Sequence, residues 1–173
     1  MHGETAQPMA TAAEANKAAS RQWIDAFNAR DEQGEADSRT ADFIGHAPAS
    51  IEPRPLDSDA WTKFLAVFVE GFPDLHLTVQ DAVGDGELVA QHILFEGTHT
   101  GVFQGLPPTN RKVTFDAIEL NRMVDGKVAE HWVQMDQVTL LQQLGLRVIP
   151  GPRLLPRLLA RQAKKLFGRP PAS

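Results

Sequence analysis

The stretch LHLTVQDAVGDGELVAQHILFEGTH, residues 75–99, decides the fold class. Its first part alternates Leu75, Leu77 and Val79 with polar side chains, which is the period of a half-buried strand. A Gly-Asp-Gly turn follows at residues 84–86, and the remaining residues have the composition of a second, longer strand. The stretch therefore predicts two antiparallel strands joined by a hairpin.

Helical spacing replaces this alternation on the N-terminal side. In residues 12–31, Trp23 and Phe27 lie four positions apart, on the apolar face of a predicted helix. Residues before that helix lack a pattern, so residues 1–14 are expected to be disordered. DFIGHAPAS, residues 42–50, is expected to be a short extended segment that ends in a loop.

A second helix is predicted between residues 57 and 71. Asp57 or Ser58 is its candidate N-cap, and Gly71 is its end, because a proline follows two residues later. Its apolar stripe consists of Trp61, Phe64, Leu65 and Phe68. Both helices thus carry large aromatic side chains on the face that would pack against the rest of the fold.

Strand patterns return after a Gly- and Pro-rich loop. Residues 112–123 and 127–136 predict two strands joined by an Asp-Gly turn, and residues 137–144 predict a short helix. The apolar parity of the first strand shifts between Phe115 and Ile118, which predicts a β-bulge between them.

Helices followed by about four antiparallel strands indicate an α+β fold. We expect a curved antiparallel sheet packed against N-terminal helices, in the form of a cone-shaped barrel that encloses a cavity. This domain is predicted to span residues 15–149, and residues 150–173 are predicted to form a separate tail.

The composition excludes several classes of protein. The chain has no cysteine, which rules out disulfides, thiolate nucleophiles and cysteine-based metal sites. It lacks the P-loop, Rossmann and zinc-protease motifs, and its six histidines have no metal-ligand spacing. We therefore expect no cofactor and no metal. Neither a signal-peptide pattern nor a long apolar run occurs, so the expected location is the cytoplasm.

Charge divides the chain into two parts. Six of the 17 Lys and Arg residues lie from Arg153 onward, where Asp and Glu are absent, and 11 basic residues accompany all 22 acidic ones before that point. The acidic body does not attract nucleic acid. The tail places leucines among basic side chains, as in an amphipathic helix. It would bind a membrane surface or a partner; the alternative is that it packs on a neighbouring subunit or on the acidic body of the chain.

Acid–base chemistry remains available through carboxylate and imidazole groups. If the strand at residues 127–136 is regular, Glu130, Trp132, Gln134 and Asp136 share one face. This polar face with one aromatic ring is typical of a pocket wall; the alternative is a solvated face with Trp132 at an edge. Asp136 directly precedes the short helix, so it is a candidate for a general base, an N-cap, or both.

Other candidates for ligand contact come from segments that would border the cavity. His99 lies where a strand enters the Gly/Pro-rich loop, and His46 has a similar position; the alternative for each is a turn histidine bonded to the backbone. Asn121 is polar within a strand and faces either the cavity or water. In a cone, the core face of the helices also lines the cavity, which adds Trp23, Phe27, Trp61 and Phe68.

Three segments resemble a known family. THTGVFQGLPPTNRKVTF at residues 98–115 and MVDGKVAEHWVQMDQVTLLQQLG at residues 123–145 are similar to the SnoaL-like polyketide cyclases, also called ester cyclases. GFPDLHLTVQDAVGDGELVA at residues 71–90 shows the same resemblance, which covers roughly residues 18–149.

The resemblance implies the cone fold of the nuclear-transport-factor-2-like superfamily and a homo-oligomer, a dimer or tetramer built through the open sheet. It also implies aldol-type ring closure of an apolar aromatic polyketide ester, without cofactor or metal. Asp136 would match the acid/base aspartate of the family and is the predicted catalytic residue. Gln134, Trp132 and Asn121 are predicted substrate contacts from strand alternation, and the resemblance does not assign them. Two alternatives stay open: a binding protein without chemistry, and an isomerase, dehydratase or epoxide hydrolase of the same fold.

Overall fold

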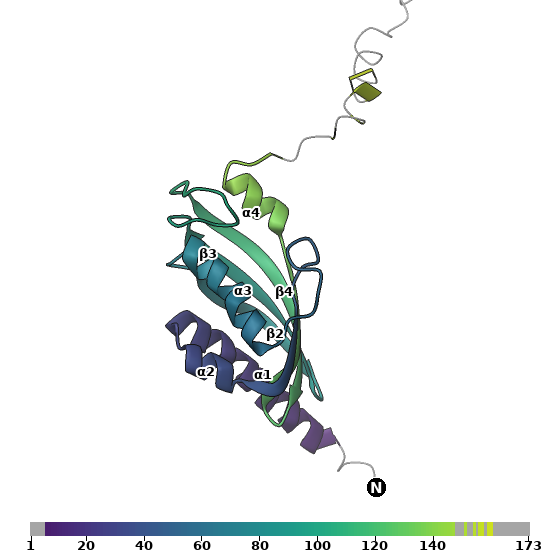
Figure 1. Cartoon of the computed structure of the whole chain (residues 1–173). Helices are drawn as coiled ribbons and strands as arrows, with labels where there is room; N and C mark the ends of the chain where they lie inside the picture. The colour runs from purple at the N-terminus through teal and green to yellow at the C-terminus, as the bar shows by residue number, and fades with distance from the viewer. Residues whose placement is uncertain (1–5, 148–150, 152–153, 155, 158, 161–173) are drawn as a thin grey trace, which may run out of the picture.

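The computed structural model describes residues 6–147 and residues 151, 154, 156, 157, 159 and 160 of the chain (Figure 1). Its elements, in chain order, are α1 (Ala6–Ala29), α2 (Glu32–Asp37), β1 (Arg39–His46), α3 (Ser58–Gly71), β2 (His76–Asp85), β3 (Leu88–Thr98), β4 (Lys112–Val124), β5 (Lys127–Met135) and α4 (Gln137–Gln143). The predicted basic helix at residues 150–173 falls almost entirely outside the described residues. Within the described part, no helix is both long and apolar enough to cross a membrane.

The strands form one sheet in the order β1-β5-β4-β3-β2. Neighbours are antiparallel except β1, which runs parallel to β5. The sheet is curved but not closed, and α1, α2 and α3 lie on one side of it (Figure 1). This arrangement confirms the predicted α+β class, with helices against a curved sheet.

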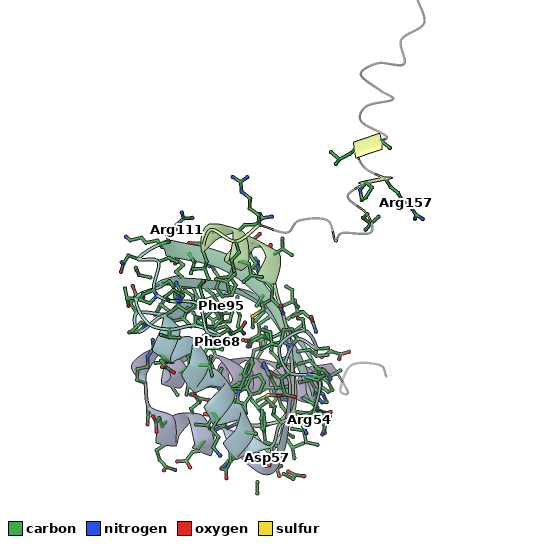
Figure 2. All side chains as sticks on the ribbon, turned by 45° about the horizontal axis from the view of Figure 1, so that its top comes forward. Arg54, Asp57, Phe68, Phe95, Arg111 and Arg157 are labelled. Atoms are coloured by element: carbon green, nitrogen blue, oxygen red, sulfur yellow. The ribbon has the colours of Figure 1, made fainter. Side chains whose placement is uncertain are left out.

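Helices α1 and α3 supply the aromatic side of the core. Trp23 and Phe27 of α1 and Trp61 and Phe68 of α3 are all buried, as their spacing predicts. Figure 2 shows Phe68 between α3 and the sheet, with Phe95 of β3 on the same interior side.

The ends of α3 follow from local chemistry. The Asp57 carboxylate accepts a hydrogen bond from the Ala60 backbone N–H at 2.9 Å, so Asp57 is the N-cap and Ser58 is the first helical residue. The helix ends at Gly71, as predicted. Gly101 packs against this end: a Cβ there would lie 1.8 Å from the Glu70 carbonyl oxygen, which leaves room only for glycine.

Two N-terminal elements differ from the sequence prediction. Helix α1 begins at Ala6, so residues 6–14 are helical where disorder is predicted; this segment is rich in alanine, the strongest helix former. The predicted extended segment at residues 42–50 is mostly strand β1, which pairs with β5 from Ile44 to His46. Because β1 pairs only with β5, which is distant in the sequence, its own residues show a weak strand pattern.

Strand β4 is regular, so the predicted bulge is wrong. Its register with β3 is unbroken from Lys112 to Arg122. Ile118 points outward and is 56% exposed, whereas Glu119 points inward and is buried. The prediction fails because it assumes that the apolar member of this pair faces the core.

Candidate active site

A pocket lies between helices α1 and α3 and the sheet. Its enclosed volume is about 40 Å³, and a wider groove of about 400 Å³ between the helices shares Phe27, Glu35 and Leu65 with it. The groove therefore adjoins the pocket at these three side chains.

Aromatic rings make up much of the pocket wall. The four predicted aromatic contacts, Trp23, Phe27, Trp61 and Phe68, all line the pocket. The rings of Trp23 and Trp61 lie 6.5 Å apart in a tilted arrangement, so they bound the pocket as a pair. Their contact with a substrate remains a prediction.

Glu119 of β4 is an acidic group on this wall, and it is 4% exposed. Its Oε2 is buried with no hydrogen-bond partner among the described residues. Burial raises the pKa of Glu119 to about 8, and the cross-strand amide of Gln91 opposes that rise. Glu119 is therefore mostly protonated at neutral pH, and its carboxylate, once formed, is a stronger base than that of an exposed glutamate.

His131 of β5 lies on the same face, diagonal to Glu119 in the sheet register. Its ring stands edge-on to Trp23 and Trp61, with centroid distances of 4.9 and 4.8 Å. Burial lowers the pKa of His131 to about 3, so the imidazole is neutral at every physiological pH.

Glu35 of α2 lies at the boundary between the pocket and the groove. Its Oε1 is 3.7 Å from Arg39 Nη1; burial raises the pKa of Glu35 and Arg39 opposes the rise. The groove also carries Glu32, Glu70 and Arg30. Within the described ranges, no group of three or more His, Asp or Glu side chains is arranged to hold a metal ion.

Asp136 lies outside this pocket. It is exposed and caps α4: Oδ1 accepts from the Thr139 backbone N–H at 2.9 Å, and Oδ2 accepts from the Thr139 hydroxyl at 2.6 Å. The bonds from Thr139 hold the pKa of Asp136 below its ordinary value. The prediction that Asp136 faces the cavity is wrong, because the alternation of β5 turns His131 and Val133 inward instead.

Comparison with known proteins assigns the chain to a family. The family model for SnoaL-like polyketide cyclase matches residues 17–144. The chain belongs to the SnoaL-like polyketide cyclase family. Membership confirms the resemblance, the cone-type fold and the class of cyclase-type enzyme.

Two curated relatives of the chain are named as cyclases. The aklanonic acid methyl ester cyclase DauD of Streptomyces sp. (strain C5) is 29% identical over 136 residues, which cover 72% of this chain and 78% of DauD. The nogalonic acid methyl ester cyclase of Streptomyces nogalater is 37% identical over 60 residues; these cover 35% of this chain and 45% of the relative, less than half of its length.

Solved structures extend the match across the domain. IdmH, a putative polyketide cyclase from Streptomyces antibioticus, is 32% identical with a TM-score of 0.70, covering 76% of this chain and 99% of IdmH. AclR, a putative hydroxylase from Streptomyces galilaeus, is 31% identical with a TM-score of 0.69, covering 77% of this chain and 97% of AclR. The fold is thus shared with proteins whose names give different activities.

Three further residues that the sequence predicts as substrate contacts lie on the outer face of the sheet. Trp132 and Gln134 point away from the pocket, and His46 stacks on Trp132 with ring centroids 5.1 Å apart. His46 Nε2 also lies 2.9 Å from Glu130 Oε1. Trp132 and Gln134 lie outside the cavity because the polar face of β5 is its outer face, which is the alternative that the sequence left open. His46 of β1 lies outside it because its ring stacks on Trp132.

Two other candidates are buried but do not line the pocket. Asn121 is fully buried behind the wall, where its amide bonds to Ser20 and His131. His99 Nδ1 accepts from the Thr109 backbone N–H at 3.2 Å, so His99 is a loop histidine bonded to backbone. Both predictions of direct ligand contact are corrected, because neither side chain is part of the pocket lining.

The sequence interpretation overlooks the three titratable groups of the pocket. Glu119 continues the inward alternation that begins at Val113 and Phe115, and this unbroken period is the signal that could have located it. His131 follows from the opposite parity of β5. Glu35 lies on a six-residue helix and has no comparable local signal.

Proposed function

We propose that this chain is a cofactor-independent cyclase that closes a ring in a neutral, apolar polyketide-type ester by an aldol-type reaction, with Glu119 as the acid/base group. The observation that carries the proposal is the unpartnered Oε2 of Glu119 on the wall of a largely apolar pocket. Asp136, exposed and bonded to Thr139, has neither property.

The reaction needs one group that takes a proton and returns it. The Glu119 carboxylate removes a proton from a carbon flanked by two carbonyls, and the carbanion attacks a carbonyl further along the same chain. A C–H bond breaks, a C–C bond forms, and the new alkoxide takes the proton back from Glu119. The raised pKa of Glu119 suits both steps, because it brings the carboxyl close to the pKa of its carbon acid.

The pocket contributes position and selectivity. Aromatic rings from α1 and α3 would hold the folded substrate so that carbanion and carbonyl meet, which is a proximity effect. Among the described residues that line the pocket, Glu35 and Glu119 are the acidic ones, and none is a Lys or Arg. Such a lining disfavours an anionic substrate and favours an ester over the free acid. The methyl ester cyclase names of two relatives agree with this preference.

The test is turnover of aklanonic acid methyl ester, the compound in the name of DauD, by matched carboxylate variants. We expect Glu119→Gln to lower kcat by about a hundredfold or more. Asp136→Asn keeps a good N-cap and should change kcat less than about twofold. In the wild type, kcat should rise with pH through the raised pKa of Glu119, about 8, as the carboxylate forms.

Two outcomes would contradict the proposal. Normal turnover by Glu119→Gln removes the assigned acid/base role, and loss of turnover in Asp136→Asn returns that role to the helix cap. A wild type that binds the ester without forming product supports the alternative of a binding protein.

We further propose that the protein is a cytoplasmic homodimer formed through the outer face of the sheet. Ile118 and Leu120 of β4 are 56% and 36% exposed there, and Ile44 of β1 is 42% exposed. The helices cover the opposite face (Figure 1). A second copy would cover these side chains by a two-fold, self-complementary contact.

A further inference from the structure

Three buried polar side chains form a chain of hydrogen bonds behind the pocket. Asn121 Nδ2 donates to Ser20 Oγ at 2.7 Å, and Asn121 Oδ1 lies 2.6 Å from His131 Nδ1. Ser20 and Asn121 are fully buried and His131 is 1% exposed. The three residues come from α1, β4 and β5, so the chain of bonds ties a helix to two strands. The acid/base role of Glu119 does not require it.

The direction of these bonds fixes the proton on His131. Because the Asn121 amide donates to Ser20 through nitrogen, its oxygen faces the imidazole, and a carbonyl oxygen only accepts. His131 Nδ1 therefore carries the hydrogen. Burial, reinforced by the positive charges of His46 and Arg39, lowers the pKa of His131 and keeps the ring neutral, so Nε2 holds a free lone pair.

The lone pair belongs to the pocket side of the ring. His131 lines the pocket, whereas Asn121 and Ser20 lie behind it, and Nε2 is on the side of the imidazole away from Nδ1. Edge contacts with Trp23 and Trp61 hold the ring in place. Among the described residues, none donates a hydrogen bond to Nε2.

We propose that Ser20 and Asn121 are positioning residues that fix His131 as a hydrogen-bond acceptor, and that this acceptor selects ligands with a phenol or enol hydroxyl. The inference rests on the proposed function only in placing the ligand in this pocket. Trp61, which also lines the pocket, has a buried Nε1 donor without a partner among the described residues, and a carbonyl oxygen on the ligand would be a suitable acceptor for it.

Binding of two probes tests the inference: 2-naphthol, which carries the hydroxyl, and 2-methoxynaphthalene, which cannot donate. We expect the wild type to bind 2-naphthol at least about tenfold more tightly. Asn121→Leu leaves Nδ1–H without its acceptor, and this preference should fall below about threefold while the affinity for 2-methoxynaphthalene stays constant. A merely structural role would weaken both probes together. Asp136→Asn, outside the pocket, is the control and should keep the preference.

Nitrogen-15 NMR of the His131 side chain gives a second readout that needs no variant. We expect the proton on Nδ1 in the wild type, and a loss of this single tautomer in Ser20→Ala, which serves if Asn121→Leu does not fold. A wild-type proton on Nε2, or equal affinity for the two probes, overturns the inference. A protein that prefers 2-naphthol but keeps turnover in Glu119→Gln contradicts only the proposed function.

Discussion

Glu119 and Asp136 are two carboxyl groups with opposite environments. Burial in an apolar pocket raises the pKa of Glu119 to about 8, whereas bonds from Thr139 hold the pKa of Asp136 below its ordinary value. A carboxylate that is stabilised by hydrogen bonds is a weak base, and one that is destabilised by burial is a strong base. The chemistry of the side chains therefore favours Glu119 for proton removal, independently of which one faces the ligand.

The raised pKa of Glu119 has a consequence for stability. The folded protein holds the Glu119 proton more tightly than the unfolded chain does. The contribution of Glu119 to the free energy of unfolding is therefore fully present below about pH 4.5 and is lost as the pH rises through about 8. Glutamine cannot ionise. We expect Glu119→Gln to gain in free energy of unfolding relative to the wild type between about pH 5 and 8, by at most about 1.4 kcal/mol per pH unit. Urea unfolding at several pH values measures the difference.

Asp136→Asn is the matched control for this measurement. The folded-state pKa of Asp136 is lowered, so its contribution is present above the unfolded pKa and is lost only in more acidic solution. Its difference from the wild type should be flat over the same pH range. Parallel curves for the wild type and Glu119→Gln would show that Glu119 is ionised in the folded protein at neutral pH.

Sequence reasoning at the residue scale succeeds where side chains are large and apolar. Trp23, Phe27, Trp61 and Phe68 are located by helical spacing alone, because burying such rings dominates the choice of face. It fails at Glu119, because a rule that turns apolar side chains inward excludes a carboxyl group from the core even where the regular alternation of β4 places it there.

Helix α4 depends on its cap and on a few contacts with the sheet. It has seven residues, and an isolated helix of this length is unstable. Leu140 is buried, and the Gln143 side chain exchanges two hydrogen bonds with the Thr114 backbone. These contacts hold the helix on the sheet, and Asp136 fixes where it begins.

Removing the cap should therefore loosen α4 without changing the chemistry. We expect Asp136→Ala to speed amide hydrogen exchange of residues 139–143 roughly fivefold, because Thr139 loses both of its bonds to the carboxylate. Turnover should be unchanged. Asp136→Asn, which can accept the same backbone bond, should exchange like the wild type. A loss of turnover in the alanine variant would contradict the expectation that Asp136 only caps the helix.

At the scale of elements, local patterns locate four strands and the helices α1, α3 and α4, and they indicate an extended segment at residues 42–50 without showing that it joins the sheet as a fifth strand. Strand β1 exists because β5 presents a free edge, and their parallel pairing joins His46 to Trp132, 86 positions along the chain. Nothing in the local sequence encodes that partner. Local sequence also does not indicate the position of Glu35. This residue lines the pocket because β1, which directly follows α2, joins the sheet there.

The whole molecule is asymmetric across its sheet. One face packs on helices and carries the pocket, and the other exposes Ile44, Ile118 and Leu120 beside Trp132. Glu130 on this outer face is bonded to Arg122 and His46, so its charge is already paired. Apolar side chains beside internally paired charges suit burial against another protein surface.

A dimer through this face makes a specific prediction for Ile118. The residue lies on the central strand of the sheet, 56% exposed, so a two-fold axis near it would bring its two copies close together. Ile118→Glu would then oppose two charges in a desolvated contact and should convert a particle of about 38 kDa to the 19.0 kDa monomer in light scattering. Val67→Glu, an exposed site on α3 across the sheet, should leave the mass unchanged. A monomeric wild type, or equal masses for the wild type and Ile118→Glu, would exclude this interface, and turnover by the monomer would show that the pocket is complete within one chain.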